Sequence, residues 1–375
     1  MKIAYIYNDK KSGTGAHYIN QLIIEKLRER GTLVESYYPR LEILDTPIHF
    51  RGIHNILFFY SLLEKQEKIL KCDIIQGTTY TPLAFMHFST PVVSHFGSTT
   101  RGFLRSVPRT SDIEGECREI FHRLQSDKVM TELDLQTLRP LKDIALIERY
   151  AATQADRVIA TSRLVQIDLI EQGIAPEKIT LIHNAIEDFW FEVREECFSV
   201  HPTLVFLGRI GDDPFTMKIK GLDRLIFLYE QFPDIQKYSI MMSRNKKLLE
   251  WLSTHISRHE LESNILKTDI PKKLSSLSGG ILLIPSRYEG FSLSLIEGMS
   301  QGLVPIIFAI GVAPEVIRNG ENGYIVESIA DAREKIALLI ADPILRKKLS
   351  VNARVSARDF SSEILIQKMT ALYDE

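Results

Sequence analysis

The stretch ILLIPSRYEGFSLSLIEGMSQG, residues 281–302, predicts a buried β-strand that leads through a short turn into a helix. Its first four residues, 281–284, form an apolar run of the kind found in a strand that is covered on both faces of a parallel sheet. Apolar residues then recur at helical spacing at Leu293, Ile296 and Met299. Two carboxylates, Glu289 and Glu297, flank the predicted start of the helix. Because ligands bind where the strands of an α/β sheet end, both glutamates are candidate binding residues.

Short β-rich runs alternate with helical patterns on both sides of this stretch. The first half of the chain has strand candidates at residues 3–7, 32–38, 72–77, 91–97, 157–162 and 179–186. The second half has them at residues 203–210, 238–242, 265–269, 281–286, 304–309 and 323–326. Strands that alternate with helices are typical of parallel βαβ units. We therefore expect an α/β protein with two doubly wound, Rossmann-like domains whose ligand-binding strand ends face one cleft.

The boundary between the two domains is expected where this alternation lapses, between Glu187 and His201. A chain of 375 residues is longer than one ordinary hydrophobic core requires, which fits two domains. Residues 101–149 interrupt the alternation with many charged side chains, and a helix is predicted within them at 116–124. No strand is predicted after residue 326, so the end of the chain is expected to be helical.

Composition excludes several classes of protein. The formal net charge of −2 provides no overall attraction to nucleic acid or to an anionic membrane, so no nucleic-acid partner is expected. Three scattered cysteines, Cys72, Cys117 and Cys197, lack the spacing of a metal site and indicate reduced thiols. The first residues turn polar too soon for a signal peptide, and no apolar run approaches the ~20 residues of a membrane helix. These features predict a cytoplasmic protein.

Two strand ends in the first half carry candidate site residues. After the first strand, Gly13 and Gly15 permit close approach of a ligand to the backbone and to the following helix. The pattern is not G-x-G-x-x-G, because Tyr18 occupies the third position, and a merely tight turn remains an alternative. The fourth strand ends near His95, and a lone histidine there is either structural or a site residue.

The second half places two cations near the end of its first strand. Arg209 lies at the end of the strand, and Lys220 follows eleven residues later, just before an apolar helix. A guanidinium and an ammonium that project into a cleft suit a pyrophosphate. The alternative is an ordinary solvated loop, and the position of Arg209 at a strand end favours the binding interpretation.

The two glutamates of the opening stretch suit a sugar. The N–H groups from Gly290 to Ser292 lie at a predicted helix N-terminus, where they can meet a hydroxyl or a phosphate oxygen. A carboxylate such as that of Glu297 accepts paired hydrogen bonds of the kind that a ribose diol offers. The alternative is a helix-start charge at Glu289 and a solvated face at Glu297, but it leaves unexplained the glycine that follows each glutamate.

The stretch EGFSLSLIE resembles the E-x7-E motif of retaining GT-B glycosyltransferases of family 4, the glycosyl transferases group 1. The continuation to Val326, the segment FLGRI…KGLDRLI and the segment TSRLVQIDLIEQGIAPEKITLIHNAIE are similar to further parts of that family. The resemblance covers nearly the whole chain, is strongest over residues 204–326 and is weakest over 101–149. It implies an N-terminal acceptor-binding domain at 1–187, a donor-binding domain at 188–355, and a C-terminal helix at 356–375 that packs back on the first domain.

Carried over position by position, the resemblance assigns roles to the candidates. Arg209 and Lys220 would bind the donor diphosphate and Glu297 the nucleotide ribose. Gly15, with Gly13 in the same loop, would lie beside the phosphate or the acceptor, and His95 near the transferred sugar. The residues that would hold the donor sugar are Glu289, Gly290, Phe291, Ser292 and Leu293. Lys218 competes with Lys220, because the family's usual spacing from the arginine is shorter than eleven residues.

The function that the resemblance implies is retaining transfer of a sugar from a nucleotide-diphosphate donor, most readily a UDP- or GDP-sugar. The acceptor would be a hydroxyl of a glycan, a lipid-linked molecule or a small molecule, in glycan, glycolipid or cell-surface polysaccharide synthesis. No metal ion or other cofactor is expected. The cytoplasmic location leaves room for peripheral contact with the inner face of the membrane.

Alternatives and departures remain. A nucleotide-sugar epimerase or hydrolase on the same fold would act without an added acceptor, and a non-catalytic partner subunit would bind the donor without turnover. The first loop reads Gly-Thr-Gly without the arginine that often follows in the family, and the linker reads Asn184-Ala185 instead of Asn-Gly. The arginines at 101, 105, 109, 118 and 123 suit an anionic acceptor, but interspersed acidic residues favour a solvated helix.

Overall fold

The computed structural model describes residues 1–7, 15–39, 58–113, 115–192 and 198–375. These residues form two compact units. Unit 1 comprises Met1–Leu104, Thr137–Glu187 and Phe360–Glu375, and unit 2 comprises Arg105–Gln136 and Asp188–Asp359. Residues 105–136 therefore belong to unit 2, whereas the expected first domain ran without interruption from 1 to 187. Gly13 and Cys197 lie outside the described residues.

Unit 1 is built on a six-stranded sheet in which every pairing is parallel, in the order β2-β1-β3-β4-β5-β6. The strands are β1 (Lys2–Ile6), β2 (Leu33–Tyr37), β3 (Ile74–Thr78), β4 (Val92–Phe96), β5 (Arg157–Ala160) and β6 (Ile179–Leu181). All residues of β4 are buried, as the apolar run in the sequence predicts for a central parallel strand. The order reverses between β1 and β3, which is a topological switch point of a doubly wound sheet.

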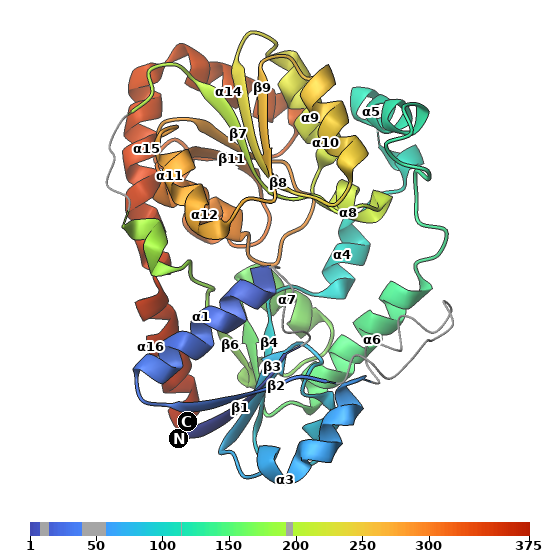
Figure 1. The fold of residues 1–375 in the computed structure, drawn as a ribbon, viewed down its shortest axis with the longest axis vertical. Coiled ribbons are helices and arrows are strands. Elements are labelled where there is room, and N and C mark those ends of the chain that lie inside the picture. The colour runs from blue at the N-terminus through green and yellow to red at the C-terminus, as the bar shows by residue number, and fades with distance from the viewer. Residues whose placement is uncertain (8–14, 40–57, 114, 193–197) are drawn as a thin grey trace. The chain divides into compact units, whose positions relative to one another are not determined.

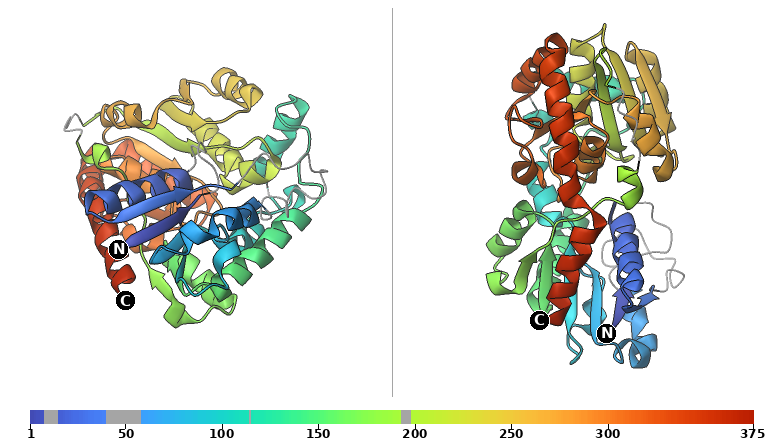
Figure 2. Two further views of the ribbon diagram at one scale, coloured as in Figure 1. Left: turned by 60° about the horizontal axis from the view of Figure 1, so that its bottom comes forward. Right: turned by 90° about the vertical axis from the view of Figure 1, so that its left-hand side faces the viewer.

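The helices of unit 1 cover this sheet (Figure 1). They are α1 (Gly15–Glu29), α3 (Gln66–Ile69), α6 (Arg139–Gln154), α7 (Arg163–Glu171) and α16 (Ser362–Asp374), and α4 (Thr100–Ser106) ends at the start of unit 2. Ser162 caps α7 by accepting a hydrogen bond from the Val165 N–H at 3.3 Å. The C-terminal helix α16 packs beside α1 (Figure 2), so the end of the chain belongs to the same unit as its beginning.

Unit 2 has a second parallel sheet, in the order β12-β11-β10-β7-β8-β9. Its strands are β7 (Thr203–Arg209), β8 (Gln236–Met242), β9 (His259–Ser263), β10 (Ile281–Ile284), β11 (Val304–Phe308) and β12 (Tyr324–Val326). The strand expected at 265–269 is wrong, because residues Lys267–Asp269 form a 3-10 turn and the edge strand is β9. This edge strand, HELES, is half exposed and has no apolar run that would identify it in the sequence.

The helices of unit 2 follow its strands in turn. They are α8 (Pro214–Ile219), α9 (Leu222–Gln231), α10 (Lys246–His255), α11 (Ile270–Ser275), α12 (Leu293–Ser300), α13 (Ala313–Val316), α14 (Ile329–Ala341) and α15 (Pro343–Ala357). Strands and helices thus alternate in both units, which confirms the two Rossmann-like α/β sheets expected from the sequence. Among the described residues, no helix is long and apolar enough to cross a membrane.

The segment 105–136 forms a helix, α5 (Gly115–Ser126), that packs against α9. Its apolar side chains, including Phe121, join the hydrophobic core of unit 2. Trp251 Nε1 donates a hydrogen bond to Asp127 at 2.7 Å, and Asn245 Nδ2 donates to the Val129 carbonyl at 3.1 Å. These contacts explain why the segment follows unit 2, although the chain on either side of it belongs to unit 1.

Candidate functional site

The turn after β10 brings Glu289 and Lys220 into an ion pair in unit 2. Glu289 Oε1 accepts hydrogen bonds from Lys220 Nζ at 2.6 Å and from Ser286 Oγ at 2.9 Å. The side chains of Lys220 and Glu289 are 27% and 15% exposed, so both groups are accessible to a ligand. An ammonium next to a carboxylate with remaining acceptor capacity can serve a phosphate and a sugar hydroxyl at the same time.

The position of Lys220 depends on the segment between β7 and α9, which the sequence predicted to be a loop. Residues 214–219 instead form α8, because Asp213 caps the helix by accepting a hydrogen bond from the Thr216 N–H at 2.9 Å. Gly221 then adopts a φ of +64°, and a Cβ at this position would lie 2.0 Å from the Pro285 carbonyl oxygen. Only glycine fits this contact, which holds the chain next to Lys220 against the turn that carries Glu289.

Lys218 was the alternative to Lys220 as the lysine that binds the donor phosphate. It is a buried structural residue with a side-chain exposure of 1%. Its ammonium binds Asp134 and donates to the Pro108 carbonyl at 3.3 Å. Burial by itself would raise the pKa of Asp134, but the hydrogen bonds from Lys218 and from Thr110 hold that pKa below its ordinary value. The nearby carboxylate of Asp213 is a helix cap, and the carboxylate that pairs with Lys218 is that of Asp134.

The start of α12 carries a strained backbone. Ser292 has a φ of +80°, and its buried hydroxyl has no hydrogen-bond partner among the described residues. Such strain in a residue other than glycine concentrates at functional sites. Gly311, with a φ of +53°, supports the turn from behind, because a Cβ there would lie 2.5 Å from the Phe291 carbonyl oxygen. Gly290, Phe291 and Ser292 are buried and Leu293 is half-buried.

Glu297 lies within α12 and is only 7% exposed, which excludes the solvated face considered from the sequence. Its Oε1 pairs with Lys267 Nζ at 3.0 Å. Sequence reasoning missed Lys267, because residues 265–269 were assigned to a strand and the lysine was not considered as a residue of a strand-end turn. A buried carboxylate that is held by one cation keeps a defined position at which a diol can bind.

Arg209 is the last residue of β7, and its side chain is exposed. In the part of the chain that the structure describes, its guanidinium forms neither an ion pair nor a side-chain hydrogen bond. Arg209 can therefore bind an anion without first breaking another contact, unlike Lys220.

His95 and Gly15 belong to unit 1. His95 is at the C-terminal part of β4, and neither ring nitrogen has a hydrogen-bond partner among the described residues. Burial lowers the pKa of His95 to about 4, and the neighbouring Asn184 amide opposes this shift only in part. The imidazole is therefore neutral at pH 7. Gly15 is the exposed first residue of α1.

Metal ligands do not gather in the described part of the chain. No group of three or more histidine, cysteine, aspartate or glutamate side chains among the described residues is arranged to hold a metal ion. The cationic candidate residues of unit 2 are Arg209, Lys220 and Lys267.

Two family profiles together match most of the chain. The profile described as Glycosyltransferase Family 4 matches residues 25–188, and the profile described as Glycosyl transferases group 1 matches residues 202–356. An uncharacterised glycosyltransferase of Methanocaldococcus jannaschii is 25% identical over 230 residues, which span 60% of this chain and 62% of that protein. The capsular polysaccharide biosynthesis glycosyltransferase CapM of Staphylococcus aureus is 25% identical over 277 residues, which span 64% of this chain and 68% of CapM. The aligned part of the chain thus spans less than two thirds of the first of these relatives.

Solved structures share the fold over the whole chain. Sucrose-phosphate synthase from Thermosynechococcus elongatus matches with a TM-score of 0.74 at 17% identity, covering 100% of this chain and 98% of that one. HepE from Anabaena, solved in complex with UDP-glucose, matches with a TM-score of 0.66 at 16% identity, covering 100% of this chain and 99% of that one. The two sheets and the two profiles agree, and the chain belongs to the group 1, family 4 glycosyltransferases with the GT-B fold.

Proposed function

We propose that this protein transfers a sugar from a UDP-sugar to a hydroxyl group and that the product keeps the anomeric configuration of the donor. The observation that carries the proposal is the Lys220–Glu289 pair, held by Ser286 at the strained start of α12. Family membership and the complex of HepE with UDP-glucose support a UDP-sugar as the donor. The name of CapM supports an acceptor in cell-surface polysaccharide synthesis.

The donor diphosphate would bind Arg209 and Lys220. Arg209 has no competing ion pair or side-chain hydrogen bond with the described residues to give up, whereas Lys220 has to turn part of its hydrogen bonding from Glu289 to the phosphate. The carboxylate of Glu289 would then accept hydrogen bonds from the donor sugar. The ammonium thus orients the carboxylate before binding and is shared with the diphosphate after binding.

The nucleotide ribose would bind Glu297. This carboxylate is nearly buried and is held by Lys267, so its position is set before the donor arrives. Charge-assisted hydrogen bonds from two ribose hydroxyls would be shorter and stronger than neutral ones.

During transfer, negative charge grows on the departing diphosphate. Arg209 and Lys220 would stabilise it, and this electrostatic term is worth about 10²-fold or more in rate for a single donor. We expect the acceptor hydroxyl to attack from the side on which the diphosphate leaves and to give its proton to the departing phosphate. The bond from the sugar to the phosphate oxygen breaks as the bond to the acceptor oxygen forms, so charge and atoms balance.

Binding and product analysis test this proposal. Isothermal titration of UDP, GDP and ADP into the purified protein should give the tightest binding for UDP, and Arg209→Met should weaken it about tenfold or more. Equal affinity for all three nucleotides, or none, would contradict a UDP-sugar donor. Release of free or isomerised sugar without added acceptor would instead indicate the hydrolase or epimerase alternative.

A further inference from the structure

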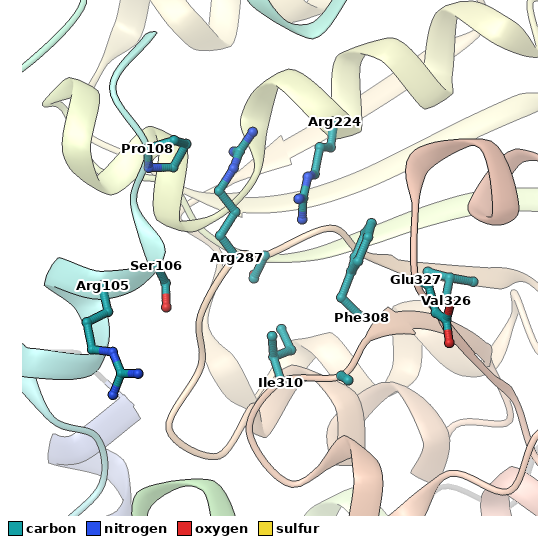
Figure 3. A pocket seen from close by; sticks show the side chains of 11 residues that line it. Arg105, Ser106, Pro108, Arg224, Arg287, Phe308, Ile310, Val326 and Glu327 are labelled. Atoms are coloured by element: carbon teal, nitrogen blue, oxygen red, sulfur yellow. The ribbon is translucent and has the colours of Figure 1, made fainter. Parts of the chain in front are cut away.

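Unit 2 contains a pocket of about 510 Å³ beside the turns that follow β10, β11 and β12 (Figure 3). Two stretches far apart in the sequence complete it: Arg224 from α9, and residues 105–108 at the start of the segment that contains α5. Neither Arg209, Lys220, Glu289 nor Glu297 lines this pocket. The pocket thus adjoins the candidate donor site and shares Ser286 with it, but the charged side chains of that site do not line it.

Arg224 gives the pocket a positive charge without a counter-charge. Its guanidinium stacks over the Phe308 ring at 4.2 Å from the centroid and donates a hydrogen bond to the Pro285 carbonyl at 3.3 Å. No carboxylate among the described residues forms an ion pair with it. Burial, with the nearby Arg287, lowers the pKa of Arg224 to about 10, which leaves it charged at neutral pH. A partly buried cation of this kind favours an anionic ligand.

The other charges of the pocket do not neutralise Arg224. Arg287 binds both oxygens of Asp223, at 2.7 and 2.5 Å, and also donates to the Lys218 carbonyl at 2.9 Å, so its charge and its donors are used. Arg105 also lines the pocket, and its guanidinium is directed away from Arg224 (Figure 3). The one carboxylate of the lining, that of Glu327, lies beside Val326 on the far side of Phe308 from Arg105 (Figure 3).

The wall formed by residues 105–108 is held in place. Pro108 accepts a hydrogen bond from Lys218 Nζ at 3.3 Å, Lys218 binds Asp134, and Asp134 accepts from the Thr110 N–H at 3.1 Å. This chain of contacts fixes the wall before any ligand binds, which reduces the entropic cost of binding. The buried Lys218 thus organises the pocket on one side while its carbonyl anchors Arg287 on the other.

We propose that this pocket is a second ligand site, which binds a phosphate-bearing small molecule about the size of a sugar phosphate. Its volume lies within the range of ordinary small-molecule sites. Arg224 binds the phosphate, and Phe308, Ile310 and Val326 provide an apolar surface for the rest of the molecule. Ser286 lines the pocket and also donates to Glu289 Oε1, so occupancy is linked to the donor-site carboxylate through one side chain.

Isothermal titration with glucose 6-phosphate, and with glucose as the uncharged probe, tests the site. Glucose 6-phosphate should bind the wild type and glucose should not. Arg224→Gln should weaken the binding of glucose 6-phosphate about tenfold or more, because it removes a charge-assisted contact. Arg318→Gln is the matched control, since Arg318 is 80% exposed, does not line the pocket and should leave binding unchanged.

A reciprocal variant separates this site from the donor site. Lys220→Ala should weaken UDP binding and leave the affinity for glucose 6-phosphate within about twofold of wild type. Loss of glucose 6-phosphate binding in Lys220→Ala, or wild-type binding in Arg224→Gln, would overturn the proposal. If Arg224→Gln does not fold, Ile310→Trp decides the question, because the larger side chain fills the pocket and should abolish binding of glucose 6-phosphate. Failure of UDP to bind the wild type would overturn the proposed function and leave this site standing.

Discussion

Replacing Lys218 with methionine should lower the stability of the protein and leave UDP binding nearly unchanged. The substitution deletes a charge-assisted hydrogen bond to Asp134, which is worth about 1.5–3 kcal/mol when both groups are buried. Lys218 is 1% exposed but Asp134 is 44% exposed, so water replaces part of the lost contact. We therefore expect a loss of about 1–2 kcal/mol, which corresponds to a fall in Tm of about 2–8 °C.

The reverse substitution sharpens this prediction. Asp134→Ala leaves the ammonium of Lys218 buried with only the Pro108 carbonyl as a described hydrogen-bond partner, and stranding a buried charge costs about 3 kcal/mol or more. Asp134→Ala should thus be the more damaging of the two changes, although aspartate is the more exposed partner. Thermal melting of both variants, followed by intrinsic fluorescence, measures the order.

Lys220→Met is the control for binding. Lys220 is 27% exposed, and Ser286 still donates to Glu289 after its removal, so Tm should change little while the Kd for UDP rises about tenfold or more. The reasoning is refuted if Lys218→Met melts like the wild type and loses UDP binding. That result would exchange the roles of the two lysines.

Three further predictions concern the carboxylate that is proposed to bind the ribose, the buried histidine and the product. Glu297→Gln should raise the donor KM about tenfold with a smaller effect on kcat, and an unchanged KM would remove the ribose assignment. Burial lowers the pKa of His95 from 6.5 to about 4 in the folded protein. As the pH falls, the imidazole is therefore protonated at a higher pH in the unfolded chain than in the folded protein. The free energy of unfolding is therefore unaffected by His95 above pH 6.5. It decreases as the pH falls towards 4, by up to roughly 3 kcal/mol. His95→Gln should make Tm fall less steeply over this pH range. Glu148, with a pKa raised by burial to about 7, acts in the opposite direction, so only the difference between variant and wild type isolates His95. NMR of the first-formed product should show the anomeric configuration of the donor, and inversion would contradict the retaining mechanism.

The residues next to strand ends were predictable because their chemistry and their place in the βα pattern coincide. Glu289 and Lys220 were candidates from the sequence, and the structure brings their charged groups to 2.6 Å. Lys267 was missed, since an edge strand with polar, half-exposed residues has no apolar run and the strand was placed too late in the chain. Because the strand was predicted a few residues too far along the chain, Lys267 was assigned to the strand and not to the turn that follows it.

The roles of Lys218 and of residues 105–136 were beyond sequence reasoning for a different reason. A helix was predicted at 116–124, within the observed α5, but an amphipathic helix does not specify which surface it covers. The partner of Lys218, Asp134, lies 84 residues away, and a contact at such separation leaves no local periodicity. The placement of Lys220, and not Lys218, beside Glu289 depends likewise on a distant contact. Gly221, which follows Lys220, packs closely against Pro285.

The assignment of residues 105–136 to unit 2 limits how this protein can exchange parts with its relatives. The chain passes from one unit to the other after residues 104, 136, 187 and 359. A recombination event that replaces only residues 188–359 would exchange α9 for the helix of a relative. It would leave α5, which packs against α9, unchanged. Phe121 and the carboxylate of Asp127 would then meet surfaces that did not evolve with them. A functional chimera therefore requires two inserted segments, so unit 2 is inherited as a split module and not as a single cassette.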